Sequence, residues 1–558
     1  MQIQPVFSTV GQLLAGKLFR IPQYQRAYAW SQKQRQDLFN DIEKVHGFGV
    51  NGAHFMATMV GLRRGKIFIA ADEFIELEVV DGQQRLTTLV LLLRAIATAL
   101  STSQLETEKK VGEELQELLV KGDDLSLLLL QTNHDSSHIC SDYLRDGSVP
   151  ENPMATITAD QNLLDAIQEC KAFVAKWVES KRSLVDLVAL IRNRLSVIFH
   201  EIEDERLVYT VFEVLNSRGL DVTWFDKLKS FLMAIVFEHG DKGSRTSTIE
   251  ELHNLWKDIY RTIGRRQSLN RETVQFAGTL KVSQQPNRPL SEESAVAELV
   301  SQCGKSAKKA VDHTKWILKV TQAEDRLLST VRLRAVTQIV QARLVAIAIF
   351  LRGFPKPLED QLLRRWENVT FRIYGLMGYD SRRAVGEYVR LAWKIHNENL
   401  PAGQIMESLS AIGEVAPLKD AVKGLWNEDW YSGWTEALRY VLYRYDEHLA
   451  KSKGQKISES QWNKIWQQEP SKSIEHVKAQ ATKVTYLHRI GNLTVLPPGV
   501  NSSLKDKDPR QKKETYRTCG LHGSSEVAAL IDKAKWSLAS VEAREKKFIK
   551  WALNEWAD

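Results

Sequence analysis

EVVDGQQRLTTL, residues 78–89, joins an apolar run to a polar turn and then to a Leu-rich segment. Residues 74–80 are rich in aromatic and β-branched side chains, which favour a strand. Residues 86–100 contain good helix formers and neither Gly nor Pro, which favours a helix. The stretch therefore predicts a strand, a turn and a helix in succession, at the centre of an α/β domain.

The turn carries polar side chains that suit an anion. Asp81 stands at or just before the predicted helix start, where its carboxylate can accept backbone N–H bonds, and Gly82 relieves the backbone. The helix N-terminus attracts a phosphate, and Arg85 in the first turn can add a forked, charge-assisted contact. The plainer alternative is that Asp81 only caps the helix and that Gln83, Gln84 and Arg85 form a solvated first turn.

Two further motifs stand upstream and downstream of this loop. Residues 21–30 read IPQYQRAYAW, and residues 211–220 read VFEVLNSRGL and are followed by WFDKLK at 224–229. In their order and their residues, the three blocks resemble the GmrS-type domain, also called domain of unknown function 262, with its IPxYQRxYxW, DGQQR and FxxxNxRG…DxxK elements. The resemblance covers roughly residues 5–235. It implies a ParB- and sulfiredoxin-like core whose DGQQR loop takes part in binding or hydrolysing a nucleoside triphosphate (NTP).

The resemblance also implies a nucleotide site. We expect Arg26 and Arg85 to hold phosphate oxygens, Asp81 to hold Mg²⁺ or to position water, and Asn216 and Lys229 to close the site. The full expected set is Tyr24, Gln25, Arg26, Asp81, Gly82, Gln83, Gln84, Arg85, Asn216 and Lys229. An alternative is a reader of DNA modification with Tyr24, Tyr28 and Trp30 as an aromatic pocket.

Composition limits the classes of protein to which the chain can belong. The 558 residues are 43% hydrophobic, enough for ordinary cores in several domains. The apolar run 89–100 contains Arg94 and is too short to span a membrane, which takes roughly 20 residues. No secretory signal is apparent, so we expect a cytoplasmic protein. The four scattered cysteines form no CxxC pair and predict free thiols.

The wider pattern predicts an α+β protein that is mostly helical, with a small mixed sheet in its N-terminal core. Residues 5–18 favour a short helix, and Ser31 is a plausible N-cap for a helix through Val45. Strands are expected at 54–61 and 66–70, separated by a turn, and at 195–202. The expected domains are a sensor domain at 1–237, a helical middle at 238–450 and a third domain at 451–558.

Basic residues gather near the C-terminus. Residues 471–517 hold four acids and ten bases, a local charge of +6: Lys472, Lys478, Lys483, Arg489, Lys505, Lys507, Arg510, Lys512, Lys513 and Arg517. Such a cluster can bind the DNA backbone, and we expect residues 505–513 to line it. The alternative is an ordinary solvated surface.

The same region contains groups that suit phosphodiester hydrolysis. Glu475 and His476 are neighbours, HRIGNLTVL follows at 488–496, and Asn501 comes next. Hydrolysis needs a base to activate water and a divalent ion to hold the phosphate. A strand with the base, a second strand and a helix with a further ligand is the order of ββα-metal, or HNH, nucleases.

Residues 462–516 resemble the HNH-like domain of unknown function 1524, the GmrD half of GmrSD-type enzymes, with its IEH…HRxGNLTxL…N…K pattern. The resemblance implies these roles: His476 as general base, Glu475 and Asn501 as metal ligands, Asn492 orienting the loop or the base, and Lys512 on phosphate. His488 is a second candidate ligand or a hydrogen-bonding group. The family's HxxP proline is missing, since Val477, Lys478, Ala479 and Gln480 follow His476.

Together these resemblances imply a GmrSD-like, modification-dependent (type IV) restriction endonuclease that acts against phage or other foreign DNA. Its partners would be double-stranded DNA, an NTP of unspecified base and Mg²⁺ or another divalent cation, with no membrane. The sequence leaves open whether it forms a homodimer. One alternative is a nucleotide-gated DNA-binding or modification-sensing protein with a weak or inactive nuclease module. A ParB-like partition or regulatory NTPase is another, but it leaves residues 475–512 without a purpose.

Overall fold

The computed structural model describes residues 5–22, 25–49, 52–121, 127–131, 137–149, 158–204, 223–241, 243–264, 266, 268–433, 435–466, 469–504 and 506–557. These form two compact units, the first from residues 1–278 and 291–322 and the second from residues 279–290 and 323–558. No helix in the described part of the chain is long and apolar enough to cross a membrane.

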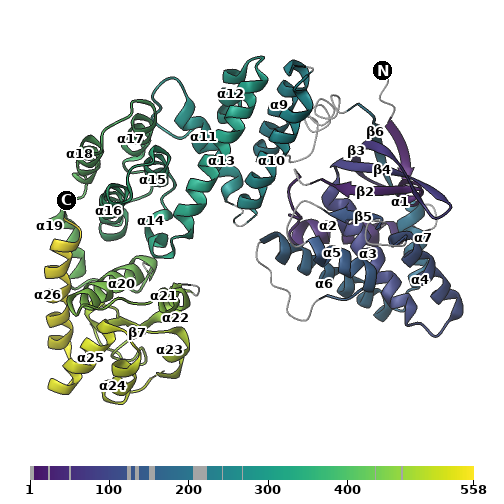
Figure 1. Ribbon diagram of the computed structural model, residues 1–558. Helices are drawn as coiled ribbons and strands as arrows, with labels where there is room; N and C mark the ends of the chain where they lie inside the picture. The colour runs from purple at the N-terminus through teal and green to yellow at the C-terminus, as the bar shows by residue number, and fades with distance from the viewer. Residues whose placement is uncertain are drawn as a thin grey trace. The chain divides into compact units, whose positions relative to one another are not determined.

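The first unit contains a six-stranded mixed sheet (Figure 1). The strand order is β1-β6-β3-β4-β2-β5. Antiparallel pairs join β1 to β6 and β3 to β4, whereas β3–β6, β2–β4 and β2–β5 are parallel. The bounds are β1 (Pro5–Thr9), β2 (Lys17–Ile21), β3 (His54–Ile69), β4 (Asp72–Asp81), β5 (Leu129–Gln131) and β6 (Leu195–Ile202). The expected mixed sheet and the expected strand at 195–202 are confirmed.

One local prediction in this sheet is wrong, and a second is right only in part. Residues 63–65, read as a turn between two strands, lie inside the single strand β3, where the pairing with β4 shifts register between Arg63 and Gly65. A bulge bends a strand without ending it. In sequence, charged residues next to Gly at a bulge look the same as those at a turn between two strands. Residues 5–18 form a strand, the short α1 (Val10–Leu14) and the start of a second strand, because Thr9 and Gln12 cap the helix at its first turn.

Helices α3, α4, α5 and α6 gather on one side of the sheet (Figure 1). The central one, α3, is apolar on almost all sides and buried, as a core helix should be. Ser31 precedes α2 as its N-cap, as expected. The helices that begin in this unit are α2 (Gln32–Gly47), α3 (Gln83–Ser101), α4 (Glu106–Leu119), α5 (Ser137–Asp146), α6 (Thr158–Glu179), α7 (Leu184–Arg194), α9 (Trp224–His239), α10 (Arg245–Ile263), α11 (Leu269–Lys281), α12 (Glu292–Cys303) and α13 (Ala307–Ser329).

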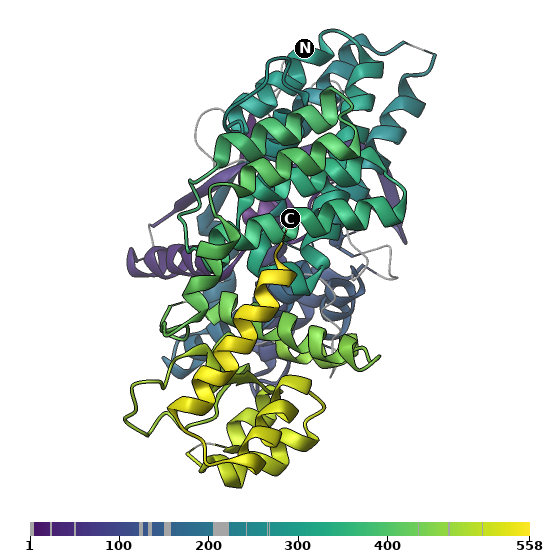
Figure 2. The ribbon, with the colours of Figure 1, turned by 90° about the vertical axis from the view of Figure 1, so that its left-hand side faces the viewer.

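The second unit is helical apart from one two-stranded sheet, in which β7 (Ile474–His476) pairs antiparallel with β8 (Leu493–Val495). The long C-terminal helix, yellow in Figure 2, is α26 (Leu538–Glu555). The other elements are η2 (Val331–Leu333), α14 (Arg334–Thr337), α15 (Val340–Arg352), α16 (Lys356–Phe371), η3 (Arg372–Leu376), α17 (Val385–Asn397), α18 (Ala402–Gly413), α19 (Leu418–Ala421), η4 (Val422–Leu425), α20 (Thr435–Ser452), α21 (Glu459–Trp466), α22 (Pro470–Ser473), η5 (Ile490–Asn492), α23 (Pro498–Leu504), α24 (Pro509–Thr518) and α25 (His522–Lys533).

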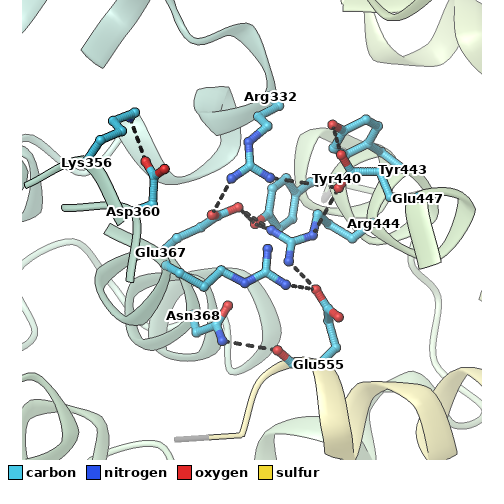
Figure 3. A network of polar contacts seen from close by, with 11 residues as sticks. Arg332, Lys356, Asp360, Glu367, Asn368, Tyr440, Tyr443, Arg444, Glu447 and Glu555 are labelled. Atoms are coloured by element: carbon cyan, nitrogen blue, oxygen red, sulfur yellow. Dashed lines mark hydrogen bonds and ion pairs between the residues drawn. The ribbon is translucent and has the colours of Figure 1, made fainter. Parts of the chain in front are cut away.

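A buried ionic network joins α16, α20 and α26 (Figure 3). Glu367 of α16 is 1% exposed and accepts hydrogen bonds from Arg444 and Tyr440 of α20 and from Arg332 at 2.9 Å. Burial alone would raise the pKa of Glu367, but Arg444, Arg332 and Arg364 together lower it below its ordinary value. Arg444 also binds Glu555 near the end of α26.

Candidate functional site

The loop between β4 and α3 has the geometry of a glycine-dependent turn. Gly82 is the N-cap of α3 with φ of 89°, a left-handed conformation that favours glycine. A Cβ at this position would lie 2.7 Å from Cγ of Met59, so any side chain would also clash. The Asp81 carboxylate accepts the Gly82 N–H at 2.8 Å. The expected strand, turn and helix are confirmed, with the cap moved from Asp81 to Gly82.

Two motifs that are far apart in sequence form one piece of structure here. Gln84 Oε1 accepts the Ala29 N–H at 2.7 Å, and its amide nitrogen donates to the carbonyl of Ala27 at 3.2 Å. The Gln83 amide nitrogen donates to the carbonyl of Arg26 at 3.3 Å, and that of Gln25 donates to the carbonyl of Val80 at 3.1 Å. The glutamines therefore fix residues 25–30 against the N-terminus of α3.

A cavity of about 500 Å³ opens beside this joint. Gln25, Arg26, residues 81–85 and Lys229 line it, so the structure brings together eight of the ten residues expected at a nucleotide site. The remaining two, Tyr24 and Asn216, lie outside the described residues. The other lining residues are Ala29, Trp30, Gln34, Asp37, Leu38, Asp41, Thr58, Val80, Thr223, Asp226 and Ser230.

The cavity holds cations close to carboxylates. Arg26 lies 3.6 Å from Asp226, which also accepts hydrogen bonds from Tyr260 at 2.7 Å and Thr223 at 2.8 Å. Lys229 is 5% exposed, and burial lowers its pKa to about 8 although Asp226 opposes this. Asp226 belongs to the quoted DxxK block, but the sequence alone assigned it no role.

Burial shifts the pKa values of both charged side chains of the DGQQR loop. Burial raises the pKa of Asp81, although the Gly82 N–H, Arg26 and Arg85 all favour its charged form. Burial lowers the pKa of Arg85, whose guanidinium carbon lies 5.6 Å from the centre of the Trp30 ring. Three cationic side chains and the first turns of α3 and α9 thus border one cavity, an arrangement that suits a phosphate-bearing ligand.

The second unit brings two expected histidines together. His476 at the end of β7 is 4% exposed, and its Nε2 lies 3.1 Å from Nδ1 of His488. Its other ring nitrogen lies 3.2 Å from the amide nitrogen of Gln480. Burial, with the positive fields of His488 and Lys512, lowers the pKa of His476 to about 3. His476 is therefore neutral at neutral pH.

A loop before α20 supports this pair, and the sequence analysis missed it. The Tyr431 ring stacks on His488 with centroids 5.3 Å apart and meets His476 edge-on at 4.5 Å. The backbone N–H of Trp430 donates to the His488 carbonyl at 3.1 Å. Tyr431 precedes His476 by 45 residues and belongs to no quoted motif, so only the three-dimensional structure identifies it.

Glu475 and His476 are consecutive residues of β7, so their side chains point to opposite faces of the strand. Its carboxylate accepts hydrogen bonds from Lys512 at 2.7 Å and Tyr516 at 2.8 Å. Lys512 is 0% exposed and also donates to the carbonyl of His476 at 2.8 Å. The structure therefore places the Lys512 ammonium inside the protein, where it orders Glu475 and β7, and not on the surface expected to contact phosphate.

The two asparagines have structural partners. Asn492 is buried and accepts the Lys478 backbone N–H at 2.9 Å and the Trp536 indole N–H at 3.0 Å, so it holds the loop after His476. The Asn501 amide donates to the carbonyls of Lys472 at 2.9 Å and Ile474 at 3.3 Å. Within the described residues, no group of three or more His, Cys, Asp or Glu side chains is arranged to hold a metal ion.

The basic cluster is partly neutralised by acids. Arg489 binds Glu545, and Lys513 and Arg517 both bind Asp532. With the buried Lys512, four of the ten bases are committed within the second unit. Lys507 and Arg510 are exposed, and Lys505 lies outside the described residues.

Replacing Lys512 tests its internal position. Lys512→Met keeps the apolar stem and removes the ammonium, so we expect the free energy of unfolding to fall by about 1–3 kcal/mol, the usual cost of an unmade buried hydrogen bond. Lys513→Met is the matched control, because its partner Asp532 is at the surface and exposed pairs contribute about 0–1 kcal/mol. Urea denaturation measures both. The phosphate role of Lys512 would be restored if Lys512→Met had unchanged stability and its DNA binding depended less on salt than that of the wild-type protein.

These features define a chain with a cavity lined by cations and carboxylates in one unit and a hydrogen-bonded histidine pair in the other. Family models agree with that division: the GmrSD restriction endonuclease N-terminal domain matches residues 10–233, and the GmrSD C-terminal domain matches residues 419–551. The chain belongs to the GmrSD restriction endonucleases, as the sequence motifs predicted. A comparison with curated proteins gives no match.

Proposed function

We propose that this restriction endonuclease hydrolyses DNA with the His476–His488 pair and that an NTP bound in the cavity of the first unit controls cleavage. The hydrogen-bonded pair inside the matched C-terminal domain is the observation that carries the catalytic part. The order β7, β8, α23 supports an HNH-like, ββα reading of this segment. DNA is the substrate that the family implies.

The two rings are proposed to act together as the base. Both ring nitrogens of His476 already have partners, whereas no hydrogen bond from the described part of the chain reaches Nε2 of the half-buried His488. His488 acts as the base in the tautomer in which its Nδ1–H donates to Nε2 of His476: the proton from water then binds to Nε2 of His488, and the Nδ1–H bond to the neutral His476 is kept. This tautomer requires the Gln480 side-chain amide to present its oxygen to Nδ1 of His476. Tyr431 holds the His488 ring by stacking, which fixes the direction of that nitrogen.

Two of the three expected metal ligands, Glu475, Asn501 and His488, have partners within the chain: Glu475 accepts a hydrogen bond from Lys512, and the Asn501 amide donates to backbone carbonyls. Metal dependence remains our proposal on chemical grounds, because Mg²⁺ commonly keeps several waters and relies on substrate phosphates. Plasmid cleavage that continues unchanged in excess EDTA would contradict it.

In the first unit, Arg26, Arg85 and Lys229 are proposed to bind the phosphates, together with the N-terminal turns of α3 and α9. The lining side chains include these three cations and four carboxylates, namely Asp37, Asp41, Asp81 and Asp226. That balance does not favour a free triphosphate, so we propose that the NTP binds with Mg²⁺, which neutralises phosphate charge when bound.

The alternative of an aromatic reader is disfavoured by the position of Tyr28. Its ring is buried in the core, and its hydroxyl lies 2.8 Å from that of Thr88. Tyr24 lies outside the described residues, so among the aromatics of that proposal only Trp30 is seen to line the cavity.

Arg85→Ala should weaken NTP binding by about 10- to 100-fold, because a charge-assisted hydrogen bond contributes about 1.5–3 kcal/mol. Isothermal titration of the full chain with ATP, GTP, CTP and UTP in Mg²⁺ measures the change. Arg63→Ala is the matched control, since Arg63 pairs with Glu201 and does not line the cavity. Equal binding by the Arg85→Ala and wild-type proteins would overturn the phosphate role of Arg85.

A further inference from the structure

The cavity has an acidic wall that phosphate binding does not explain. Gln34, Asp37, Leu38 and Asp41 of α2 all line it, and their spacing of three and four residues places them on one helical face. The Asp41 carboxylate lies 3.3 Å from Lys44 and 3.4 Å from His54, whereas Asp37 is exposed. Carboxylates repel phosphate oxygens and accept hydrogen bonds, so this wall suits hydrogen-bond donors on a ligand.

A second observation points to the same requirement. Gln83 is 7% exposed and lines the cavity, and its amide nitrogen is used by the carbonyl of Arg26. Its Oε1 is buried and has no hydrogen-bond partner among the described residues. A buried acceptor without a donor is unusual in a folded protein, and a ligand or a bound water that donates to it is one explanation. The cavity therefore offers unused acceptors as well as cations.

The donor-rich part of a nucleotide is its sugar. A ribose carries two vicinal hydroxyls, which carboxylates commonly bind as paired donors, whereas a deoxyribose has one. Trp30, at the start of α2, supplies an aromatic surface in the same cavity. A volume of about 500 Å³ lies within the range of roughly 300–1,000 Å³ that is usual for small-molecule sites.

We propose that the cavity selects ribonucleoside over deoxyribonucleoside triphosphates, and that the carboxylates of α2, with Asp37 foremost, accept the ribose hydroxyls. This inference rests on the proposed nucleotide function and adds a sugar specificity to it. In this arrangement the triphosphate lies toward Arg26, Arg85 and Lys229, and the sugar lies toward α2. Asp37 is then a specificity-determining residue that the motifs do not include.

The test compares three probes on the full chain with Mg²⁺: each ribonucleoside triphosphate, its 2′-deoxy counterpart and inorganic tripolyphosphate. We expect the ribonucleotide to bind about tenfold more tightly than the deoxyribonucleotide, as the loss of a hydrogen bond to a charged group predicts. Asp37→Asn should bring that ratio close to one and leave tripolyphosphate binding unchanged. Glu43→Gln is the matched control, because Glu43 lies on α2, pairs with Arg182 and does not line the cavity.

The outcomes separate the two proposals. If no nucleotide and no tripolyphosphate binds, the nucleotide function itself fails. If all three probes bind but sugar type makes no difference in the wild-type protein, only the ribose inference is overturned. It is also overturned if Asp37→Asn weakens ribonucleotide, deoxyribonucleotide and tripolyphosphate equally, because Asp37 would then act at the phosphate or its cation.

Discussion

His476→Ala is expected to reduce DNA cleavage by about 10²- to 10⁴-fold, the range commonly lost with a general acid or base. The substitution removes the ring that contacts His488 at 3.1 Å, so it eliminates one member of the proposed base and frees the other. Supercoiled plasmid cleavage at matched protein concentration measures the loss. Near-wild-type cleavage by the variant would rule out the histidine pair as the hydrolytic centre.

Two companion variants separate chemistry from folding. His522→Ala removes a histidine of the same unit that is not part of the pair, and we expect it to cleave as the wild-type protein does. His476→Gln retains hydrogen-bonding capacity at a buried position but removes the imidazole ring that contacts His488 and meets Tyr431 edge-on. We expect it to remain as stable as the wild-type protein in urea while losing activity to a similar degree as His476→Ala.

Glu367→Ala should lower the free energy of unfolding of the second unit by about 3–5 kcal/mol. The cost is large because Arg444 is 1% exposed and would be left buried without its main counter-charge, which is the expensive way to break a buried pair. Tyr440 and Arg332 lose the same acceptor. Urea denaturation of the full chain, followed through the transition of this unit, measures the change.

The network offers its own control in Glu447, whose side chain is 36% exposed and lies 3.5 Å from Arg444 and 3.8 Å from Arg332. We expect Glu447→Ala to cost about 1 kcal/mol or less, because partly exposed ion pairs contribute little. If both variants lower stability equally, burial is not what makes the Glu367 network important. The comparison uses the same cations with two carboxylates in different solvent environments (Figure 3).

The network also bears on the histidine site, because α26 contacts both. Arg544 donates to the carbonyls of Gly491 and Leu493, and Glu545 binds Arg489 next to His488. Ten residues further on, Glu555 binds Arg444, about 15 Å away at the rise of an α-helix. A loosened network is therefore expected to disturb the segment that positions His488 as well as the fold of the second unit.

Where local patterns decide structure, the sequence was informative. The strand–turn–helix at residues 78–89 and the strand at 195–202 follow from composition and turn chemistry, which act over a few residues. The meeting of Arg26 and Lys229 with the Asp81–Arg85 loop in one cavity was anticipated only through the family resemblance, since these contacts are not local in sequence.

The remaining errors have physical causes of the same kind. Glu475 and His476 are neighbours in sequence, but strand geometry sends them to opposite faces, so adjacency did not imply a joint role. Lys512 was read as a surface cation because its burial depends on Glu475 and Tyr516, which lie across a tertiary contact. Tyr431 and Asp37 had no motif to mark them, and their positions emerge only when the chain is folded.

The most direct test of the central claim is a single cleavage series. Plasmid DNA, modified and unmodified, is incubated with Mg²⁺ and the full chain, with no nucleotide or with each NTP in turn, for the wild-type and Arg85→Ala proteins. The account predicts that at least one NTP changes the wild-type cleavage rate and that Arg85→Ala removes this response, although Arg85 lies in the first unit and the histidine pair in the second. Cleavage by the wild-type protein at one rate, whichever nucleotide is present, would contradict it.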